Sequence, residues 1–399
     1  MAREIITNWY EAYQEYTERW EPPKIFNKWV ALSILSVATQ RQVWLQEGNS
    51  RLWPNLYVVF VGPSGSGKTS AMREAVPFLD ALGIRRSPSK FIHPSQMIVD
   101  MVEATKEIEG TGLVTPYMMW AEELPSFLGR DAFKNGVLSD LTTLYDCPEP
   151  AFVNPILKRN NDVVPLPYVC MLAGTTPDGI FEVLPPGTVG QGFTSRLIMV
   201  SGSYSADRVA EKPWDNVHEQ IQSALIHDLD LVSRLKGSMR FSRTAGMIWR
   251  DFYDNRKTPE QEFNDPRLQG YASRKPMYVK KISMLLSLAE SDSMIVEAYH
   301  VEKAIHLLRE VDLSIGEIYD EVAPSLIVQH YPRVLKVLKG ATGRTMSHSQ
   351  LMQRFSHSLD KNTFGLVMGG LDEMGKVLKE AVKSGNTNRY TVYYTLMEK

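Results

Sequence analysis

The chain has 399 residues, of which 43% are hydrophobic, so it can bury one large core or the cores of two to three ordinary domains. Lys and Arg number 44 against 46 Asp and Glu, and this net charge of -2 excludes a uniformly basic nucleic-acid-binding chain. The two cysteines, Cys147 and Cys170, form no metal-binding spacing and favour a reducing compartment.

Targeting signals are not evident at the amino terminus. It mixes charged and apolar residues from its first positions, so we expect no signal peptide. No stretch approaches the ~18 consecutive apolar residues that a membrane helix needs. We therefore expect a cytoplasmic protein without a membrane partner.

The first half of the chain predicts a helical collar followed by an α/β core. Residues 5–46 have helical spacing on both sides of a Pro-Pro break, and we assign residues 1–50 to the collar. Short apolar runs then alternate with helical stretches, which is typical of a parallel sheet covered by helices. The core is expected over residues 51–205, with strands at 56–62, 117–121, 168–174 and 196–202.

The second half predicts two further modules. From residue 206 we expect only helices, which would form a lid domain over residues 206–323. Residues 324–399 predict three helices and then a two-stranded hairpin with a polar turn, which is the order of a winged helix.

The sequence GPSGSGKT, directly after the first predicted strand and before a helix, matches the P-loop pattern GxxxxGK[ST]. Its glycines allow consecutive backbone N–H groups to turn inward around the phosphates of ATP. Lys68 would neutralise the β- and γ-phosphates, and the Thr69 hydroxyl would bind Mg²⁺. The predicted nucleotide-binding residues are Gly62, Pro63, Ser64, Gly65, Ser66, Gly67, Lys68, Thr69 and Ser70.

An acidic pair follows the second predicted core strand. In P-loop enzymes one such carboxylate orients Mg²⁺ and the other activates the attacking water. We assign Glu122 to the metal and Glu123 to the general base. Glu122 stands where Asp is usual, and the alternative is that both residues merely begin a solvated helix.

Two further strand ends carry candidate catalytic residues. Thr176 follows the third core strand, where it could hold the attacking water or sense the γ-phosphate, although ordinary turn chemistry is the alternative. Arg196 directly precedes the fourth strand and could reach the γ-phosphate of a neighbouring subunit. A plain surface arginine is the alternative there.

The order PNLYVVFVGPSGSGKT, MMWAEEL, LYD, LAGTTP and GQGFTSRLIMV, followed by a helical lid, resembles the AAA+ helicase-like ATPases of phages, prophages and plasmids. The minichromosome-maintenance-type replicative helicases are more distant relatives. The resemblance implies that Thr176 is at the sensor 1 position, Arg196 is an arginine finger and Arg274 is at the sensor 2 position. It also implies a hexameric ring, with each active site completed by the next subunit, and a primase or initiator protein as a further partner.

Candidate DNA contacts lie in two segments. Residues 151–169 predict a hairpin with Lys158 and Arg159 at its tip, and in the resembling helicases a hairpin here enters the central channel; Lys134 is a second candidate for that channel. Residues 325–399 contain 11 Lys and Arg against 5 Asp and Glu. The basic residues predicted to bind DNA there are Lys376, Lys379, Lys383 and Arg389.

These observations together predict an ATP-driven DNA translocase, the replicative helicase of a phage or other mobile element, acting on single-stranded or forked DNA. One alternative is a loader or initiator that uses ATP to assemble on DNA without unwinding it. A small-molecule P-loop kinase is disfavoured, because it has little use for a finger arginine, a lid and a winged helix. The C-terminal module could also brace the ring or meet a protein instead of DNA.

Overall fold

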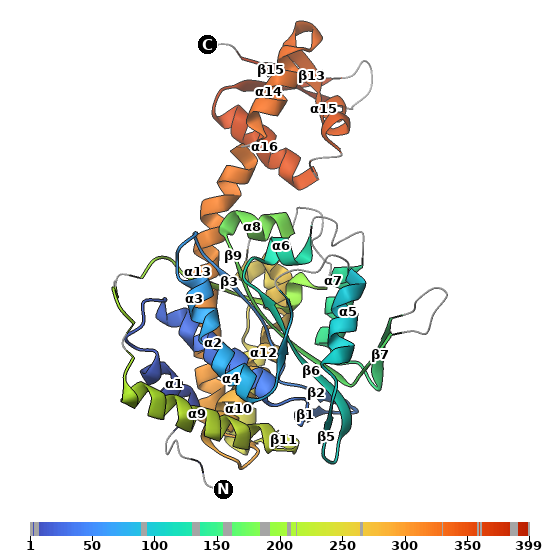
Figure 1. Ribbon diagram of the computed structural model, residues 1–399. Coiled ribbons are helices and arrows are strands. Elements are labelled where there is room, and N and C mark those ends of the chain that lie inside the picture. The colour runs from blue at the N-terminus through green and yellow to red at the C-terminus, as the bar shows by residue number, and fades with distance from the viewer. Residues whose placement is uncertain are drawn as a thin grey trace. The chain divides into compact units, whose positions relative to one another are not determined.

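The computed structural model describes residues 3, 8–88, 94–129, 136–154, 162–183, 192–205, 209–212, 214–263, 266–328, 330–356, 359, 361–383 and 390–397. The chain divides into two compact units (Figure 1). The first contains Met1–Leu184 and Gly190–Gly316, and the second contains Pro185–Val189 and Glu317–Lys399. No helix in the described part of the chain is long and apolar enough to cross a membrane.

The main sheet of the first unit has the strand order β10-β3-β9-β6-β4, with β5 paired to β6. All pairs along this order are parallel, and β5 alone is antiparallel. The predicted parallel α/β sheet and its four core strands are therefore confirmed. The strands are β3 (Tyr57–Val61), β4 (Arg85–Arg86), β5 (Lys106–Ile108), β6 (Gly112–Ala121), β9 (Pro167–Thr175) and β10 (Leu197–Ser201).

Helices cover both faces of this sheet. In Figure 1 the amino-terminal helices lie on one side of the strands and α7 on the other. The strands are apolar on both faces, so that every residue of β3 is buried. The helices around the sheet are α3 (Lys68–Arg73), α4 (Val76–Ala81), α5 (Pro94–Glu103), α6 (Leu124–Leu128), α7 (Val137–Tyr145) and α8 (Pro177–Val183), with the short helix η1 (Thr194–Arg196) before β10.

The predicted amino-terminal helices are present as α1 (Trp9–Tyr16) and α2 (Lys24–Ala38). The second ends earlier than predicted, because residues 43–47 form strand β1 (Val43–Glu47). Most of α2 is buried, and the ring of Phe26 stacks on that of Phe60 in β3 with centroids 4.5 Å apart. A helix that is apolar all round belongs to a core, so α2 is part of the sheet domain.

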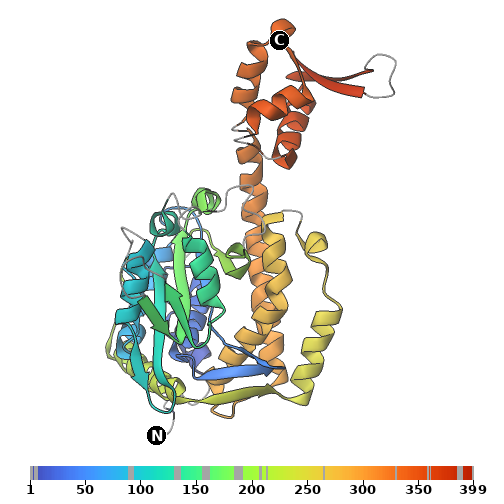
Figure 2. The same cartoon turned by 90° about the vertical axis from the view of Figure 1, so that its right-hand side faces the viewer.

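A second sheet joins β1 to segments far along the chain. Its order is β12-β11-β1-β2, and it contains β2 (Ser50–Leu52), β11 (Gly237–Phe241) and β12 (Ile295–Val296). Figure 2 shows this sheet beside the long helices of the first unit. The expectation that strands stop at residue 206 was therefore wrong. The helices of this region are α9 (Asn216–Arg234), α10 (Arg243–Asp254), α11 (Pro259–Glu262), α12 (Pro266–Glu290) and α13 (Ala298–Val328), of which α10, α12 and α13 match predicted helical segments.

The predicted hairpin after α7 is present as two antiparallel strands, β7 (Ala151–Asn154) and β8 (Asp162–Pro165). Lys158 and Arg159 at its tip, and Lys134, lie outside the described residues.

The C-terminal unit has the predicted three helices and two-stranded hairpin, and it adds a third strand. Its sheet has the order β13-β15-β14. Its core contains Val334, Leu351, Phe364 and Tyr394, one residue from each of four elements. The elements are α14 (Tyr331–Lys339), η2 (Thr342–Arg344), β13 (Thr345–Ser347), α15 (His348–Phe355), α16 (Lys361–Glu373), β14 (Val377–Lys383) and β15 (Tyr390–Leu396).

Candidate functional site

The GPSGSGKT loop connects β3 to α3 at the carboxyl edge of the main sheet. Gly65 and Gly67 have φ angles of 82° and 84°, in the left-handed region where a side chain is strained. A Cβ atom on Gly62 would lie 2.2 Å from the carbonyl oxygen of Gly202, the residue after β10. These three positions therefore require glycine, because of backbone conformation in two cases and close packing in the third.

Lys68 begins α3 and points back over this loop. Its Nζ donates hydrogen bonds to the carbonyl oxygens of Gly62 and Pro63, both at 2.7 Å. Only 6% of the residue is exposed, and burial lowers its pKa while Glu123 acts in the opposite direction. No described carboxylate forms an ion pair with Lys68, so this buried cation faces the loop with two carbonyl oxygens and, at 3.5 Å, the Ser66 hydroxyl as its partners. Such a group favours a bound anion.

A cavity of about 400 Å³ lies against the loop. Glu123 comes to it from the start of α6, where its side chain makes no capping hydrogen bond. The structure thus brings Lys68, Thr69 and Glu123 together, although they come from two different strand ends. The lining residues are Glu21, Pro22, Ser64, Gly65, Ser66, Gly67, Lys68, Thr69, Ser70, Glu123, Tyr204 and Ser205.

Glu122, the predicted metal ligand, does not line this cavity. Its carboxylate pairs with the guanidinium of Arg73 at the end of α3, with 3.3 Å between nitrogen and oxygen. The oxygen ligands on the cavity wall include the Thr69 hydroxyl and the carboxylates of Glu123 and Glu21, which are of the type that Mg²⁺ prefers. Among the described residues there is no group of three His, Cys, Asp or Glu that could hold a metal ion.

Thr176 follows β9 at the same edge of the sheet. Its hydroxyl accepts a hydrogen bond from the backbone N–H of Gly179, at 3.1 Å, and so caps α8. The preceding residue, Thr175, accepts a hydrogen bond from the N–H of Gly62 at 3.2 Å. The end of β9 is therefore tied to the start of the glycine-rich loop, but Thr176 itself is not part of the cavity wall.

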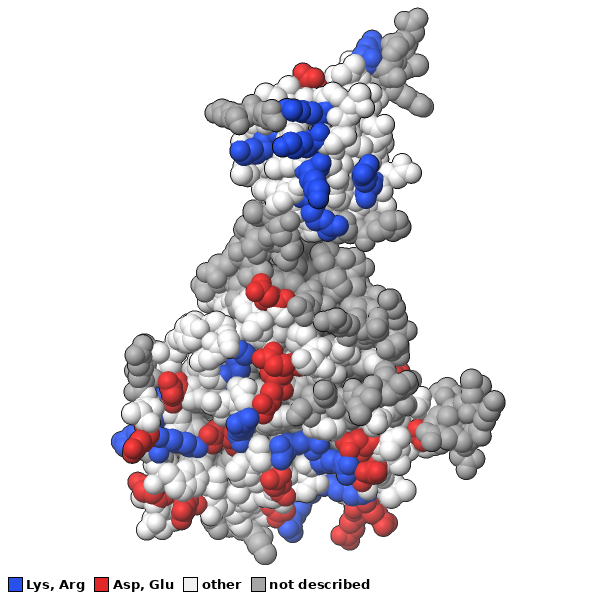
Figure 3. All heavy atoms as spheres, turned by 45° about the horizontal axis from the view of Figure 1, so that its top comes forward, with Lys and Arg blue, Asp and Glu red and all other residues white. Residues whose placement is uncertain are grey.

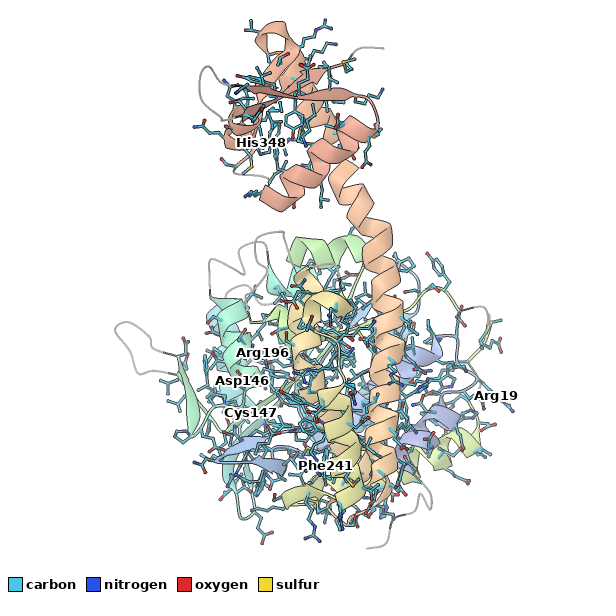
Figure 4. The ribbon with its side chains drawn as sticks, turned by 180° about the vertical axis from the view of Figure 1, so that it is seen from behind. Arg19, Asp146, Cys147, Arg196, Phe241 and His348 are labelled. Atoms are coloured by element: carbon cyan, nitrogen blue, oxygen red, sulfur yellow. The ribbon has the colours of Figure 1, made fainter. Side chains whose placement is uncertain are left out.

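Arg196 lies at the opposite edge of the sheet. Leu197 pairs with Tyr57 at the amino ends of the strands, whereas Ser201 pairs with Val61 beside the loop. Four residue steps along a strand correspond to roughly 13 Å. The Arg196 side chain is nearly buried and forms a two-pronged ion pair with Asp146, the residue after α7 (Figure 4).

Arg274 of α12 lies at this amino edge too. Its Nε donates a hydrogen bond to the Ser195 hydroxyl at 3.0 Å. A third cation, Lys281, is fully buried nearby and donates to the carbonyl and side-chain oxygens of Asn55 at 2.9 and 2.8 Å. Neither of the two arginines predicted to contact nucleotide therefore lies beside its own subunit's GPSGSGKT loop.

Sequence analysis missed several cavity residues. Tyr204 donates a hydrogen bond from its hydroxyl to the carbonyl oxygen of Ser64 at 2.9 Å, and Pro22 packs on Gly67. Glu21 and Ser205 complete this side of the wall. Tyr204 could have been found from its place just after a predicted strand, since the loops at the carboxyl ends of parallel strands share one edge. Pro22 and Glu21 offer no comparable signal.

The predicted DNA-binding residues of the C-terminal unit are exposed where they are described. Lys376, Lys379 and Lys383 lie at the start of β14 and along it, and Arg389 is outside the described residues. Figure 3 shows Lys and Arg side chains gathered over this unit.

Comparison of the sequence with protein-family models gives no match, and comparison with curated proteins finds no significant relative.

Proposed function

We propose that this chain is an ATP-hydrolysing motor with an AAA+-like P-loop core, which forms a ring and moves on DNA. The supporting observation is the cavity against the GPSGSGKT loop, where buried Lys68 meets Thr69 and Glu123. A loop with two left-handed glycines, an unpaired buried cation and a nearby carboxylate suits binding and hydrolysis of a nucleoside triphosphate.

Each residue has a distinct role in this proposal. Backbone N–H groups of residues 64–69 bind phosphate oxygens, and Lys68 exchanges its loop carbonyls for the β- and γ-phosphates. Thr69 would hold Mg²⁺, which neutralises phosphate charge when bound. Glu123 accepts the proton of the attacking water as general base. Thr176, whose hydroxyl caps α8 outside the cavity wall, would have to turn toward the cavity to orient that water.

The position of the two arginines supports the proposed assembly. Arg196 and Arg274 lie at the edge of the sheet away from their own loop, so they could contact nucleotide only in a neighbouring subunit. A ring of identical subunits, which we take to be a hexamer, provides such a neighbour at every site. Arg196 would have to exchange Asp146 for the neighbour's phosphate.

The proposed substrate is single-stranded or forked DNA, bound through the C-terminal unit, which we interpret as a winged helix, and through the β7–β8 hairpin. The proposed biological role is replicative unwinding for a phage or other mobile element in the cytoplasm, together with a primase or initiator protein.

Strand displacement from a labelled fork, measured beside ATP hydrolysis with and without single-stranded DNA, tests this proposal. A helicase hydrolyses ATP faster with DNA and separates the fork. A loader or initiator binds DNA and ATP but leaves the fork intact. Absence of ATP hydrolysis in the wild type would contradict the proposed motor. Hydrolysis at the same rate in wild type and Lys68→Ala would contradict it as well.

A further inference from the structure

The C-terminal unit carries an excess of cations that its elements do not share equally. Its described residues 330–397 include nine Lys and Arg against three Asp and Glu, namely Asp372, Glu373 and Glu380, while the end of α13 adds Glu317, Asp320 and Glu321 to the same unit. The cations are Arg333, Lys336, Lys339, Arg344, Arg354, Lys361, Lys376, Lys379 and Lys383.

Helix α14 has the densest row of these cations. Arg333, Lys336 and Lys339 follow one another at intervals of three residues, and all three are exposed. Val334 and Leu338, on the other side of the helix, are buried in the core of the unit. Because α14 is fixed by its apolar side, its basic row is held outward as a rigid surface about 9 Å long, at 1.5 Å of rise per residue.

This basic row has no ion-pair partner among the residues whose side chains the structure describes. No described carboxylate forms an ion pair with Arg333, Lys336 or Lys339, whereas many cations of the first unit do have such partners, for example Arg85 with Asp100 and Lys28 with Glu310. Mutual repulsion in an unneutralised row is unfavourable, and an external polyanion relieves it.

The two helices that precede the hairpin offer a different surface. The exposed residues of α16 include Gly365, Leu366 and Gly369, and only Lys361 at its start is basic. Helix α15 contributes one cation, Arg354. Gly370 is a packing position, since a Cβ atom there would lie 2.0 Å from the Tyr331 hydroxyl at the start of α14. Helix α16 therefore lacks the row of donors that reading base edges or binding several phosphates requires.

We propose that the exposed row Arg333, Lys336 and Lys339 of α14 binds the phosphate backbone of nucleic acid, and that α16 does not read the bases. This inference rests on the proposed function in requiring a nucleic-acid partner, but it assigns the contact to an element that the sequence did not indicate. Duplex DNA carries one negative charge per about 1.7 Å of its axis, so three cations spaced over the helix can each meet a phosphate. The binding is then sensitive to salt and indifferent to sequence.

Two double variants, each of which removes two positive charges, test the assignment in the full chain. Lys336→Gln with Lys339→Gln removes two charges from the row, and Arg354→Gln with Lys361→Gln removes two exposed charges from the other helices. Binding is measured by fluorescence anisotropy with a labelled random-sequence DNA duplex over a series of KCl concentrations. We expect the α14 variant to reduce the slope of log K against log salt by about 1.8, at about 0.9 per phosphate contact, and the control variant to leave it almost unchanged.

Melting temperatures of both variants show whether loss of binding reflects loss of folding, because Lys336 and Lys339 also interact favourably with the carboxyl end of α14.

Equal slope reductions in the two variants, or none in the α14 variant, would overturn the inference while leaving the proposed motor intact. Wild-type protein that binds vesicles of anionic lipid but neither DNA nor RNA would overturn the inference and the proposed substrate together. Preserved ATP hydrolysis in that case would show that the P-loop assignment still holds.

Discussion

The two edges of the main sheet hold cations in contrasting ways. At the carboxyl edge, Lys68 is buried beside a cavity and contacts only loop carbonyls and, at 3.5 Å, the Ser66 hydroxyl. At the amino edge, Arg196 is paired with Asp146, and Lys281 is held by Asn55. Lys68 and Lys281 each have two close oxygen partners, but only Lys68 adjoins a described cavity with space for a ligand. Burial of a cation thus indicates a binding site where a cavity lies beside it.

A large loss of turnover is expected at the carboxyl edge, where Glu123→Gln removes the proposed general base. We expect ATP turnover to fall by about 10² to 10⁴ while nucleotide binding is retained, because an amide keeps the shape of the carboxylate but cannot accept the proton. Turnover is measured by phosphate release, and binding by a fluorescent ATP analogue.

Glu122→Gln is the matched control, since Glu122 is the adjacent residue but pairs with Arg73 away from the cavity. It should change turnover far less than Glu123→Gln. The reverse order would show that Glu122 is the catalytic or metal-binding carboxylate, as its place in the acidic pair first indicated.

Lys68→Ala should abolish turnover and weaken nucleotide binding, since Lys68 stabilises the phosphates in both the ground state and the transition state.

The next effect concerns Arg196 and tests whether the amino edge is purely structural. Arg196→Ala should lower turnover strongly if the arginine acts on a neighbour's nucleotide; in small GTPases, arginines supplied in this way contribute about 10³ to 10⁵ in rate. Mixing Arg196→Ala subunits with Lys68→Ala subunits should restore part of the activity, because some interfaces then join an intact loop to an intact arginine.

Asp146→Asn separates this role from packing. It frees Arg196 from its ion pair without removing the guanidinium, so we expect folding to be retained and ATP turnover to be equal to or above that of the wild type. If the mixture of Arg196→Ala and Lys68→Ala subunits recovers no activity, and Asp146→Asn also loses turnover, then the Arg196–Asp146 ion pair only stabilises the subunit.

The main sheet could be predicted from local sequence, whereas the second sheet and the partner of Arg196 could not. The strands β3, β6, β9 and β10 are apolar runs of strand length, so hydrophobicity along the sequence is enough to predict them. Strand β12 has two residues and β11 has five, and both are defined by pairing across long sequence separations. The same limit applies to Arg196, whose partner Asp146 is 50 residues away. The GPSGSGKT loop could be singled out because its glycines and lysine are contiguous in the sequence.

The smallest expected effect compares the two buried lysines through pH. Burial lowers the pKa of Lys281 to about 7, well below its usual 10.5. The unfolded chain therefore binds more protons than the folded protein between pH 7 and 10.5, and this lysine makes folding more favourable as pH rises through that window. Relative to Lys281→Met, the wild type should gain about 1 kcal/mol of unfolding free energy per pH unit above pH 7, measured by urea unfolding. Lys68→Met should show a smaller difference of the same sign, because Glu123 opposes the effect of burial on Lys68. Parallel pH profiles for wild type and Lys281→Met would mean that Lys281 stays protonated on its Asn55 oxygens, and that the amino edge solvates its cations as fully as water does.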